Sequence, residues 1–329
     1  MRCKASFSRR RILAALAAVS GTQAIPAAHA QTWPSRPVRL LVPFPPGGGA
    51  DFIARMLGQK LGELWGQTVI VDNRPGASTM IAMEAVAKAA PDGHTLVLTV
   101  SNHSSNPALF SKIPYDTVRD FTPITLVGSA PMVLVVNPRL PAKTLQELLA
   151  YLRERPGKLS YASAGNGSVG HLGGELLKQS TGVDMVHIAY KGTGPAEIDL
   201  IGGTVELMFT GMVTALPQVR AGKMRAIAVG SAGRSSALPE LPSVQEGGVA
   251  GFDSSIWYGL LGPAGLPRDI VARVHGDVGR VLQQADTRSK LLSQGAEAIG
   301  STPEQFARQI DAEIARWSAL VKAAGIKSE

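Results

Sequence analysis

Three glycine-rich segments, each between a strand-like and a helix-like stretch, carry the clearest chemical signal in the sequence. They occupy residues 43–51 (PFPPGGGAD), 163–171 (SAGNGSVGH) and 190–196 (YKGTGPA). Each segment would present free backbone N–H groups and the positive end of a helix dipole at one point, which makes an anion site that needs no charged side chain. A glycine also lets a ligand oxygen approach the main chain closely. One such loop is better explained as a simple turn, but three in one chain favour a binding site.

One of these loops also matches a cofactor pattern. Gly165, Gly167 and Gly170 spell G-x-G-x-x-G after a predicted strand and before a predicted helix, as in a dinucleotide-binding fold. The alternative function is therefore an exported oxidoreductase that uses residues 165–170 as a dinucleotide site. Two features count against this alternative. The motif should open the first strand–helix–strand unit of a dinucleotide domain, but a predicted helix and strand precede it. The acidic residue that binds the ribose should end the next strand, but the candidate, Asp184, begins that strand.

Other catalytic and metal-binding patterns are absent from the sequence. The 43–51 loop lacks the G-K-[ST] ending of a nucleotide triphosphate loop, and Asn166 stands two positions before Ser168, where a nucleophile elbow has glycine. The only cysteine is Cys3, so residues 31–329 contain no thiol that could act as a nucleophile, form a disulfide or bind a metal. The histidines form no i, i+4 pair of the kind that binds zinc. The sequence therefore predicts no catalytic residue, no metal and no cofactor.

The first thirty residues have the features of an export signal. Five basic residues occur within the first eleven positions, the apolar run ILAALAAVSG follows, and AHA precedes Gln31. This pattern predicts a signal peptide of residues 1–30, cleavage after Ala30 and a periplasmic mature protein. The stretch SRRRIL also fits a twin-arginine signal, so the Sec and twin-arginine routes both stay open. No later stretch has the roughly 18 consecutive apolar residues that a membrane span needs.

The net charge does not indicate nucleic-acid binding. The chain carries 33 Lys and Arg residues against 25 Asp and Glu residues, a formal charge of +8. Without the five basic residues of the predicted signal, 28 basic and 25 acidic residues remain, so most of the excess belongs to the leader. We expect no nucleic-acid partner.

Strand-like and helix-like segments alternate through the rest of the chain, which predicts an α/β fold. Apolar stretches near residues 128–133 and 250–257 bracket a middle block, as in a chain that crosses twice between two lobes. The carboxyl ends of the strands, and with them the glycine-rich loops, would face the cleft between these lobes. We predict a two-lobed α/β protein with two mainly parallel sheets and a two-strand hinge. Lobe 1 would comprise residues 31–131 and 254–329, and lobe 2 would comprise residues 132–253.

Over nearly all of the predicted mature chain, the sequence resembles the Bug/TctC family of extracytoplasmic solute receptors, the binding components of tripartite tricarboxylate transporters. The resemblance rests on ordered motifs, among them WPSRPVRLLVPFPPGGGADFIARML, VDNRPGAS, PDGHTLVL, YASAGNGSVGHLGGELLKQSTGVDMVHIAYKGTGPAEIDLIGG and WYGLLGPAGLP. It implies a two-lobed periplasmic binding protein of the Venus-flytrap type that closes on a small carboxylate and is not an enzyme. The expected partners are membrane permease subunits or a sensor, and we expect a monomer.

The resemblance also implies which residues contact the ligand. Gly47, Gly48 and Gly49 would donate N–H groups from the first lobe, and the second lobe would grip through its own two glycine-rich loops. The full set expected at the site is Phe44, Gly47, Gly48, Gly49, Asp51, Ser101, Ser163, Asn166, Gly167, Ser168, His171, Lys191, Gly192, Thr193, Gly194 and Thr210.

Two positions depart from the family pattern. Ala189 stands where a proline often precedes the Tyr-Lys-Gly motif, and Thr210 follows the VELMF strand where an aspartate is common. If position 210 faces the cleft, the change removes a negative charge that would favour an ammonium group. We therefore predict a carboxylate ligand without a free amine.

Overall fold

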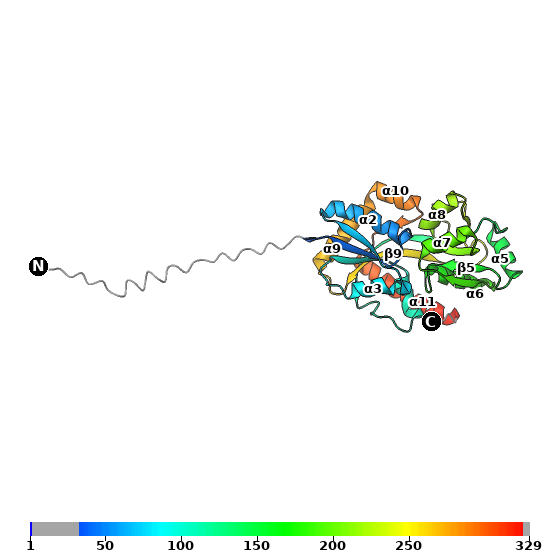
Figure 1. The fold of residues 1–329 in the computed structure, drawn as a ribbon, viewed down its shortest axis with the longest axis horizontal. Coiled ribbons are helices and arrows are strands. Elements are labelled where there is room, and N and C mark those ends of the chain that lie inside the picture. The colour runs from blue at the N-terminus through cyan, green and yellow to red at the C-terminus, as the bar shows by residue number, and fades with distance from the viewer. Residues whose placement is uncertain (2–32, 325–329) are drawn as a thin grey trace. The chain divides into compact units, whose positions relative to one another are not determined.

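The computed structural model describes Met1 and residues 33–324, so the predicted signal peptide, apart from Met1, lies outside the described residues. Strands and helices alternate along residues 33–324, as predicted for an α/β protein (Figure 1). Among the helices of this range, none combines the length and the hydrophobicity that a bilayer span requires.

The strands form two sheets that share one strand. In the first sheet, β1 runs parallel to β2 and β3, β9 is antiparallel to both β3 and β4, and β10 is antiparallel to β4. In the second sheet, β5 runs parallel to β6 and β7, and β4 is antiparallel to both β7 and β8. The strands are β1 (Val38–Val42), β2 (Val69–Asn73), β3 (Thr95–Val100), β4 (Phe121–Val136), β5 (Ser160–Ser163), β6 (Val186–Ala189), β7 (Leu207–Gly211), β8 (Arg225–Val229), β9 (Ser255–Pro263) and β10 (Glu297–Ala298).

The long strand β4 passes from one sheet into the other. It pairs with β9 as far as Pro131; from Met132 it pairs with β7, and from Val133 it also pairs with β8. The chain returns beside this crossing at Ser254, whose carbonyl oxygen accepts from the Met132 N–H at 3.2 Å and whose N–H donates to the Gly230 carbonyl at 2.7 Å. We call the part of the chain around the first sheet the first lobe and the part around the second sheet the second lobe. The predicted two-strand connection is confirmed, whereas the sheets are mixed because β4 and β9 run antiparallel to their neighbours.

Helices cover both faces of the first sheet because successive residues of a strand point to opposite sides. Leu40 and Val42 pack in one cluster with α2 and α9, whereas Leu41 packs in another with α3 and α11. The helices are α2 (Gly49–Trp65), η1 (Ala77–Thr79), α3 (Met80–Ala87), α4 (Asn102–Leu109), α5 (Leu145–Arg153), α6 (Val169–Thr181), α7 (Thr193–Gly202), α8 (Met212–Arg220), α9 (Arg268–Gln283), α10 (Ala285–Ser293) and α11 (Pro303–Ala324).

The C-terminal helix α11 also contacts the second lobe. Trp317 and Val321 of α11 pack in one apolar cluster with Leu109 of α4 and Leu172 of α6. The Arg316 guanidinium donates to the Asp253 carbonyl oxygen at 2.9 Å, next to the return crossing of the chain. The two lobes are therefore held together by the crossing strands and by this helix.

A close backbone contact at Gly128 of β4 gives a test of the sheet geometry. A Cβ atom at Gly128 would lie 2.5 Å from the Glu297 carbonyl oxygen of β10, and this backbone atom cannot rotate away. We expect Gly128→Ala to lower the free energy of unfolding by about 1–3 kcal/mol, measured by urea unfolding. Gly276→Ala in α9 is the matched control, because nothing lies within 4 Å of its Cβ position; it should stabilise the helix by about 0.5–1 kcal/mol. Equal effects of the two variants would contradict the β4–β10 pairing.

Candidate ligand-binding site

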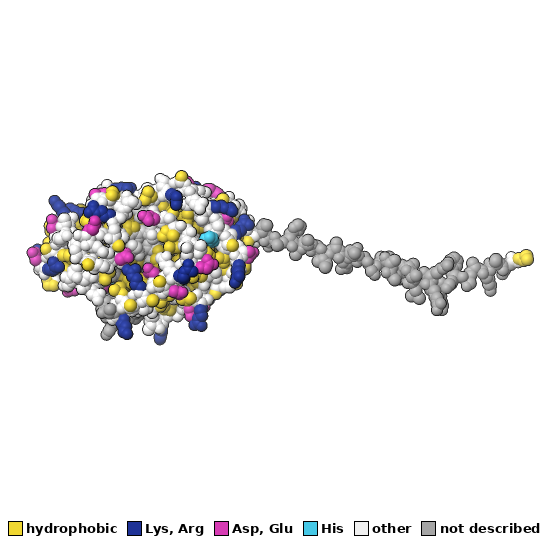
Figure 2. All heavy atoms as spheres, turned by 180° about the vertical axis from the view of Figure 1, so that it is seen from behind, with side chains coloured by type: hydrophobic (Ala, Val, Ile, Leu, Met, Phe, Trp, Pro, Cys, Tyr) yellow, Lys and Arg dark blue, Asp and Glu magenta, His cyan; other side chains and the backbone are white. Residues whose placement is uncertain are grey.

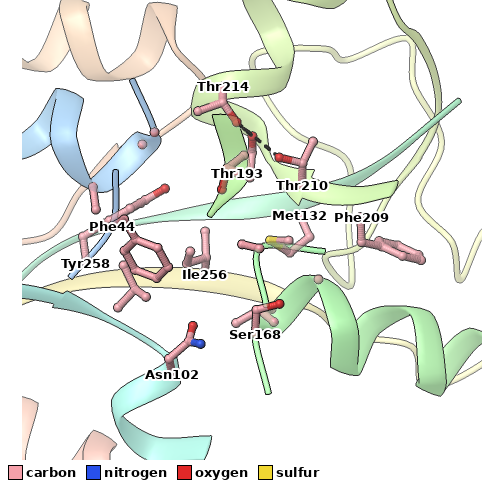
Figure 3. Close-up of a pocket in the computed structure, with 18 of the residues that line it drawn as sticks. Phe44, Asn102, Met132, Ser168, Thr193, Phe209, Thr210, Thr214, Ile256 and Tyr258 are labelled. Carbon is pink, nitrogen blue, oxygen red and sulfur yellow. Dashed lines mark hydrogen bonds between the residues drawn. The ribbon is translucent and has the colours of Figure 1, made fainter. Parts of the chain in front are cut away.

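A pocket lies between the two lobes, with about 580 Å³ of empty space when the solvent-open mouth is included (Figure 3). From the first lobe it is lined by Phe44, Pro45, Gly48, Gly49, Ala50, Val100, Asn102, Ile256 and Tyr258. From the second lobe it is lined by Met132, Ala164, Ser168, Val169, Gly170, Thr193, Met208, Phe209, Thr210, Gly211 and Thr214.

Several helices begin at this pocket. Its wall contains the first residues of α2, α4, α6 and α7, and also Gly211, which precedes α8. Gly48, Gly192 and Gly211 are the N-cap residues of α2, α7 and α8, and none of the three helices has a side-chain cap. The first N–H groups of a helix have no intrahelical acceptor, so these three helix starts leave donors for an anion.

The pocket wall is uncharged. Among the lining residues, all of which belong to the described part of the chain, none has a charged side chain. The polar side chains are Asn102, Ser168, Tyr258 and three threonines, and the rest of the surface is apolar or backbone. Burial raises the pKa of Tyr258, so its hydroxyl stays neutral. Such a wall can hold an anion through N–H and O–H donors while its apolar surface contacts a carbon chain.

Six of the sixteen predicted site residues line the pocket: Phe44, Gly48, Gly49, Ser168, Thr193 and Thr210. Thr210 faces the cavity beside Thr214 (Figure 3). The position at which an aspartate is common in the family pattern therefore lies in the pocket wall and carries no charge here. The other ten predicted residues are not part of the wall; they are Gly47, Asp51, Ser101, Ser163, Asn166, Gly167, His171, Lys191, Gly192 and Gly194.

Asp51 and Ser101 hold the first-lobe wall from behind. The Asp51 carboxylate accepts from the Gly47 N–H at 3.0 Å, from Arg55 and from Asn73. Burial would raise the pKa of Asp51, but the hydrogen bonds from Arg55, Gly47 and Asn73 outweigh it and lower the pKa. The Ser101 hydroxyl oxygen accepts from the Trp257 N–H of β9 at 3.0 Å. Both side chains thus fix the backbone that lines the pocket.

The glycines of the 165–170 loop are required by the fold. Gly165 and Gly167 have φ values of +132° and +74°, in the left-handed region that favours glycine. Their N–H groups donate to Ser163 Oγ at 3.2 Å and to His171 Nδ1 at 3.1 Å, so protein acceptors already use them. At Gly170 a Cβ atom would lie 2.4 Å from the Phe209 carbonyl oxygen, so glycine lets α6 pack closely on β7. This pattern needs no dinucleotide to explain it.

His171 belongs to a small polar cluster near the pocket. Its ring stacks on that of His187 with centroids 4.0 Å apart, and His187 Nε2 lies 2.6 Å from Ser163 Oγ. Burial, with the positive charges of His171 and Lys178 as smaller causes, lowers the pKa of His187 to about 3. Burial also lowers the pKa of His171. Both rings are therefore neutral near pH 7, and they position the 163–168 loop.

The remaining predicted residues lie where the lobes touch. Ser78 Oγ donates to the Asn166 carbonyl at 2.8 Å, and Ser105 Oγ donates to the Gly167 carbonyl at 2.9 Å. Gly192 packs on Pro45, because a Cβ atom there would lie 2.6 Å from Pro45 Cδ. A Cβ atom at Gly194 would lie 3.9 Å from the Pro46 carbonyl oxygen. Lys191, next to Gly192, is exposed. These contacts join the two lobes beside the pocket.

Several wall residues were not predicted from the sequence. Asn102 begins α4, whose polar residues and internal Pro107 gave no helical signal. Met132 and Tyr258 sit on the strands β4 and β9 beside the crossing, and Thr214 lies in the first turn of α8. A usable signal was the rule that ligands bind at the carboxyl ends of strands, because α8, which carries Thr214, follows β7 directly and Asn102 comes two residues after β3.

Two lobes joined by crossing strands, with an uncharged pocket between them at the starts of several helices, are the architecture of a solute-binding protein. The chain belongs to the tripartite tricarboxylate transporter family receptors (TctC), whose family model matches residues 53–326. Protein BugT of Bordetella pertussis is 38% identical over 320 residues, which cover 96% of this chain and 98% of BugT. The resemblance to the Bug/TctC receptors is confirmed.

Solved structures agree with this assignment. An R. palustris protein with adipate matches with a TM-score of 0.88 and 37% identity, over 90% of this chain and 100% of that chain. MatC from Rhodopseudomonas palustris with bound malate matches with a TM-score of 0.84 and 35% identity, over 88% and 100%. The periplasmic binding protein BugD matches with a TM-score of 0.87 and 34% identity, over 90% and 100%. The two-lobed periplasmic binding protein fold is confirmed.

The close packing at Gly170 can be tested by adding one methyl group. We expect Gly170→Ala to lower the thermal midpoint by several degrees, because a shift of α6 away from β7 costs about 1–3 kcal/mol. Gly194→Ala in the first turn of α7 is the control, since its nearest contact beyond the chain neighbours is an ordinary 3.9 Å. A Gly170→Ala protein as stable as the wild type, by calorimetry, would show that α6 does not need this contact.

Proposed function

We propose that this receptor captures a small organic carboxylate without a free amine between its two lobes and presents it for uptake or sensing. The observation that carries the proposal is the uncharged pocket at the N-termini of α2, α6, α7 and α8. Backbone N–H groups at helix starts bind an anion without a desolvated cationic side chain. The similar proteins with adipate and malate support a small carboxylate as the ligand class.

The selectivity against amines rests on Thr210. The residue lines the pocket, and the wall contains no carboxylate that could pair with an ammonium group in the described structure. An ammonium ion moved from water into this wall would lose hydration without gaining a counter-ion. Malate and aspartate differ mainly in a hydroxyl against an ammonium group, so they form a matched pair of ligands for this proposal.

Closure of the two lobes is the proposed signal. A ligand that contacts both walls stabilises the closed arrangement, and a membrane permease or a sensor would recognise that state. The change of pairing partner of β4 between Pro131 and Met132, with the return at Ser254, supports lobe boundaries at residues 31–131 plus 254–329 and 132–253. We further propose export by the signal of residues 1–30 and a monomeric receptor.

The alternative, an exported oxidoreductase with a dinucleotide at residues 165–170, has weaker support. The three glycines serve backbone geometry, and the two N–H groups that a pyrophosphate would need are bonded to Ser163 and His171. A binding screen with NAD(H) separates this alternative from a carboxylate receptor.

We predict that a thermal-shift screen of the purified protein will give positive shifts for dicarboxylates such as adipate and malate. At a hundredfold excess over its dissociation constant, a ligand adds about 2.7 kcal/mol to the free energy of unfolding. Calorimetry should show weaker binding of aspartate than of malate. A response to NAD(H) with none to carboxylates would overturn the receptor proposal, and tighter binding of aspartate than of malate would overturn the amine selectivity.

A further inference from the structure

A buried carboxyl group lies directly behind the wall of the pocket. Glu197 of α7 is only 8% exposed, and its Oε1 accepts from the Thr210 hydroxyl at 3.0 Å. Thr210 Oγ1 lies 3.2 Å from Thr214 Oγ1, and the Thr214 hydroxyl donates to the Gly211 carbonyl at 3.2 Å (Figure 3). Both threonines line the pocket, whereas Glu197 does not. Glu197 therefore contacts the ligand space only through these hydroxyl groups.

The protonation state of Glu197 decides where the hydroxyl hydrogens point. Each threonine has one O–H donor. When Glu197 is ionised, Thr210 donates to it, and Thr214 donates either to it or to the Gly211 carbonyl, so neither of these two hydroxyl hydrogens points into the pocket. When Glu197 is neutral, its own O–H can donate to Thr210 Oγ1, and the Thr210 hydrogen is free to point into the pocket. Only the second arrangement lets the Thr210 hydroxyl donate to a ligand carboxylate, and it also removes a negative charge from behind the wall.

We propose that Glu197 is a positioning residue that sets the donor direction of Thr210, so that a carboxylate ligand binds together with the uptake of one proton by Glu197. This inference rests on the proposed carboxylate-binding function. It adds a coupling between capture and pH, because an ionised Glu197 opposes the ligand both as a like charge and as an acceptor that withdraws the Thr210 hydrogen.

The surroundings of Glu197 favour its neutral form. Burial raises the pKa of Glu197, and hydrogen bonds from Thr214 and Thr210 offset this only in part. No cation of the described structure acts on the carboxyl group. A ligand carboxylate placed against Thr210 would raise the pKa of Glu197 further. Ligand binding and protonation of Glu197 therefore favour each other.

The charged and titratable groups on the neighbouring elements are bonded elsewhere. α7 packs against β5 and β7; the titratable residue of β5 is Tyr161, which donates to Glu175 at 2.7 Å, and β7 has none. Asp199 on α7 accepts from the Tyr190 hydroxyl at 2.6 Å. Arg220, the charged residue of α8, donates to the Ser293 carbonyl at 3.2 Å. Glu197 is thus the titratable group that faces Thr210.

The test is isothermal titration of malate into wild-type protein and Glu197→Gln between pH 6 and 8.5, in buffers of different ionisation enthalpy. We expect wild-type affinity to fall by up to about tenfold per pH unit above the pKa of Glu197, with an uptake approaching one proton. Glu197→Gln imitates the neutral acid, so its affinity should be independent of pH, free of proton uptake and at least equal to that of the wild type at low pH. Glu175→Gln is the matched control, because the Glu175 carboxyl group also accepts a hydrogen bond from a hydroxyl, that of Tyr161. Its malate affinity should vary with pH as in the wild type.

A second variant keeps the proposal testable if Glu197→Gln does not fold. Thr210→Val removes the hydroxyl but keeps Glu197. It should bind malate more weakly than the wild type at pH 6 and with a smaller pH dependence, because only the like charge of Glu197 remains. Wild-type binding without proton uptake, or an unchanged pH profile in either variant, would overturn the proposal while leaving carboxylate capture intact. If no carboxylate binds the wild type at any pH, the proposed function itself fails.

Discussion

The structure depends on one arrangement, in which several helices direct their N-terminal N–H groups into the same small space. Each of these helices follows a strand after a short connection, which is rich in glycine before α2, α6 and α7, so the helix starts at the carboxyl end of its strand. The positive ends of several helices meet at this pocket, and the resulting electrostatic potential favours an anion there. The absence of charged side chains from the described wall follows from the same arrangement, because the backbone already supplies the positive potential.

The shared strand β4 joins the two sheets. Pairing with β9 and β10 holds its first part in one sheet, and pairing with β7 and β8 holds its end in the other. Beside the crossing, backbone hydrogen bonds join Ser254 to Met132 and to Gly230. Helix α11 adds an apolar contact with α6. Side-chain contacts such as Ser78 with Asn166 also join the lobes across the cleft.

Polar side chains near the pocket act mainly on the backbone or on other side chains. Asp51 holds the glycine loop, Ser101 fixes β9, and the stacked histidines support the 163–168 loop. The pocket wall therefore contains neutral donors, and the direction of a hydroxyl hydrogen depends on the hydrogen-bond partners outside the pocket. Glu197 is the clearest case, because a carboxyl group outside the pocket controls a hydroxyl inside it. Selectivity in such a site comes from hydrogen-bond direction as much as from charge.

The sequence alone determined the α/β alternation, the two crossings, the family and the three glycine-rich loops, because periodicity, turn residues and motifs are local properties of the chain. It did not predict α4, whose buried polar residues and proline lack helical periodicity, or Tyr258 and Thr214 in the wall. It treated Asp51 and His171 as ligand contacts, although their side chains hold loops. Only the tertiary structure decided which loop residues reach the pocket, and that Glu197 stands behind Thr210, because these contacts join residues of different elements whose distance no local pattern encodes.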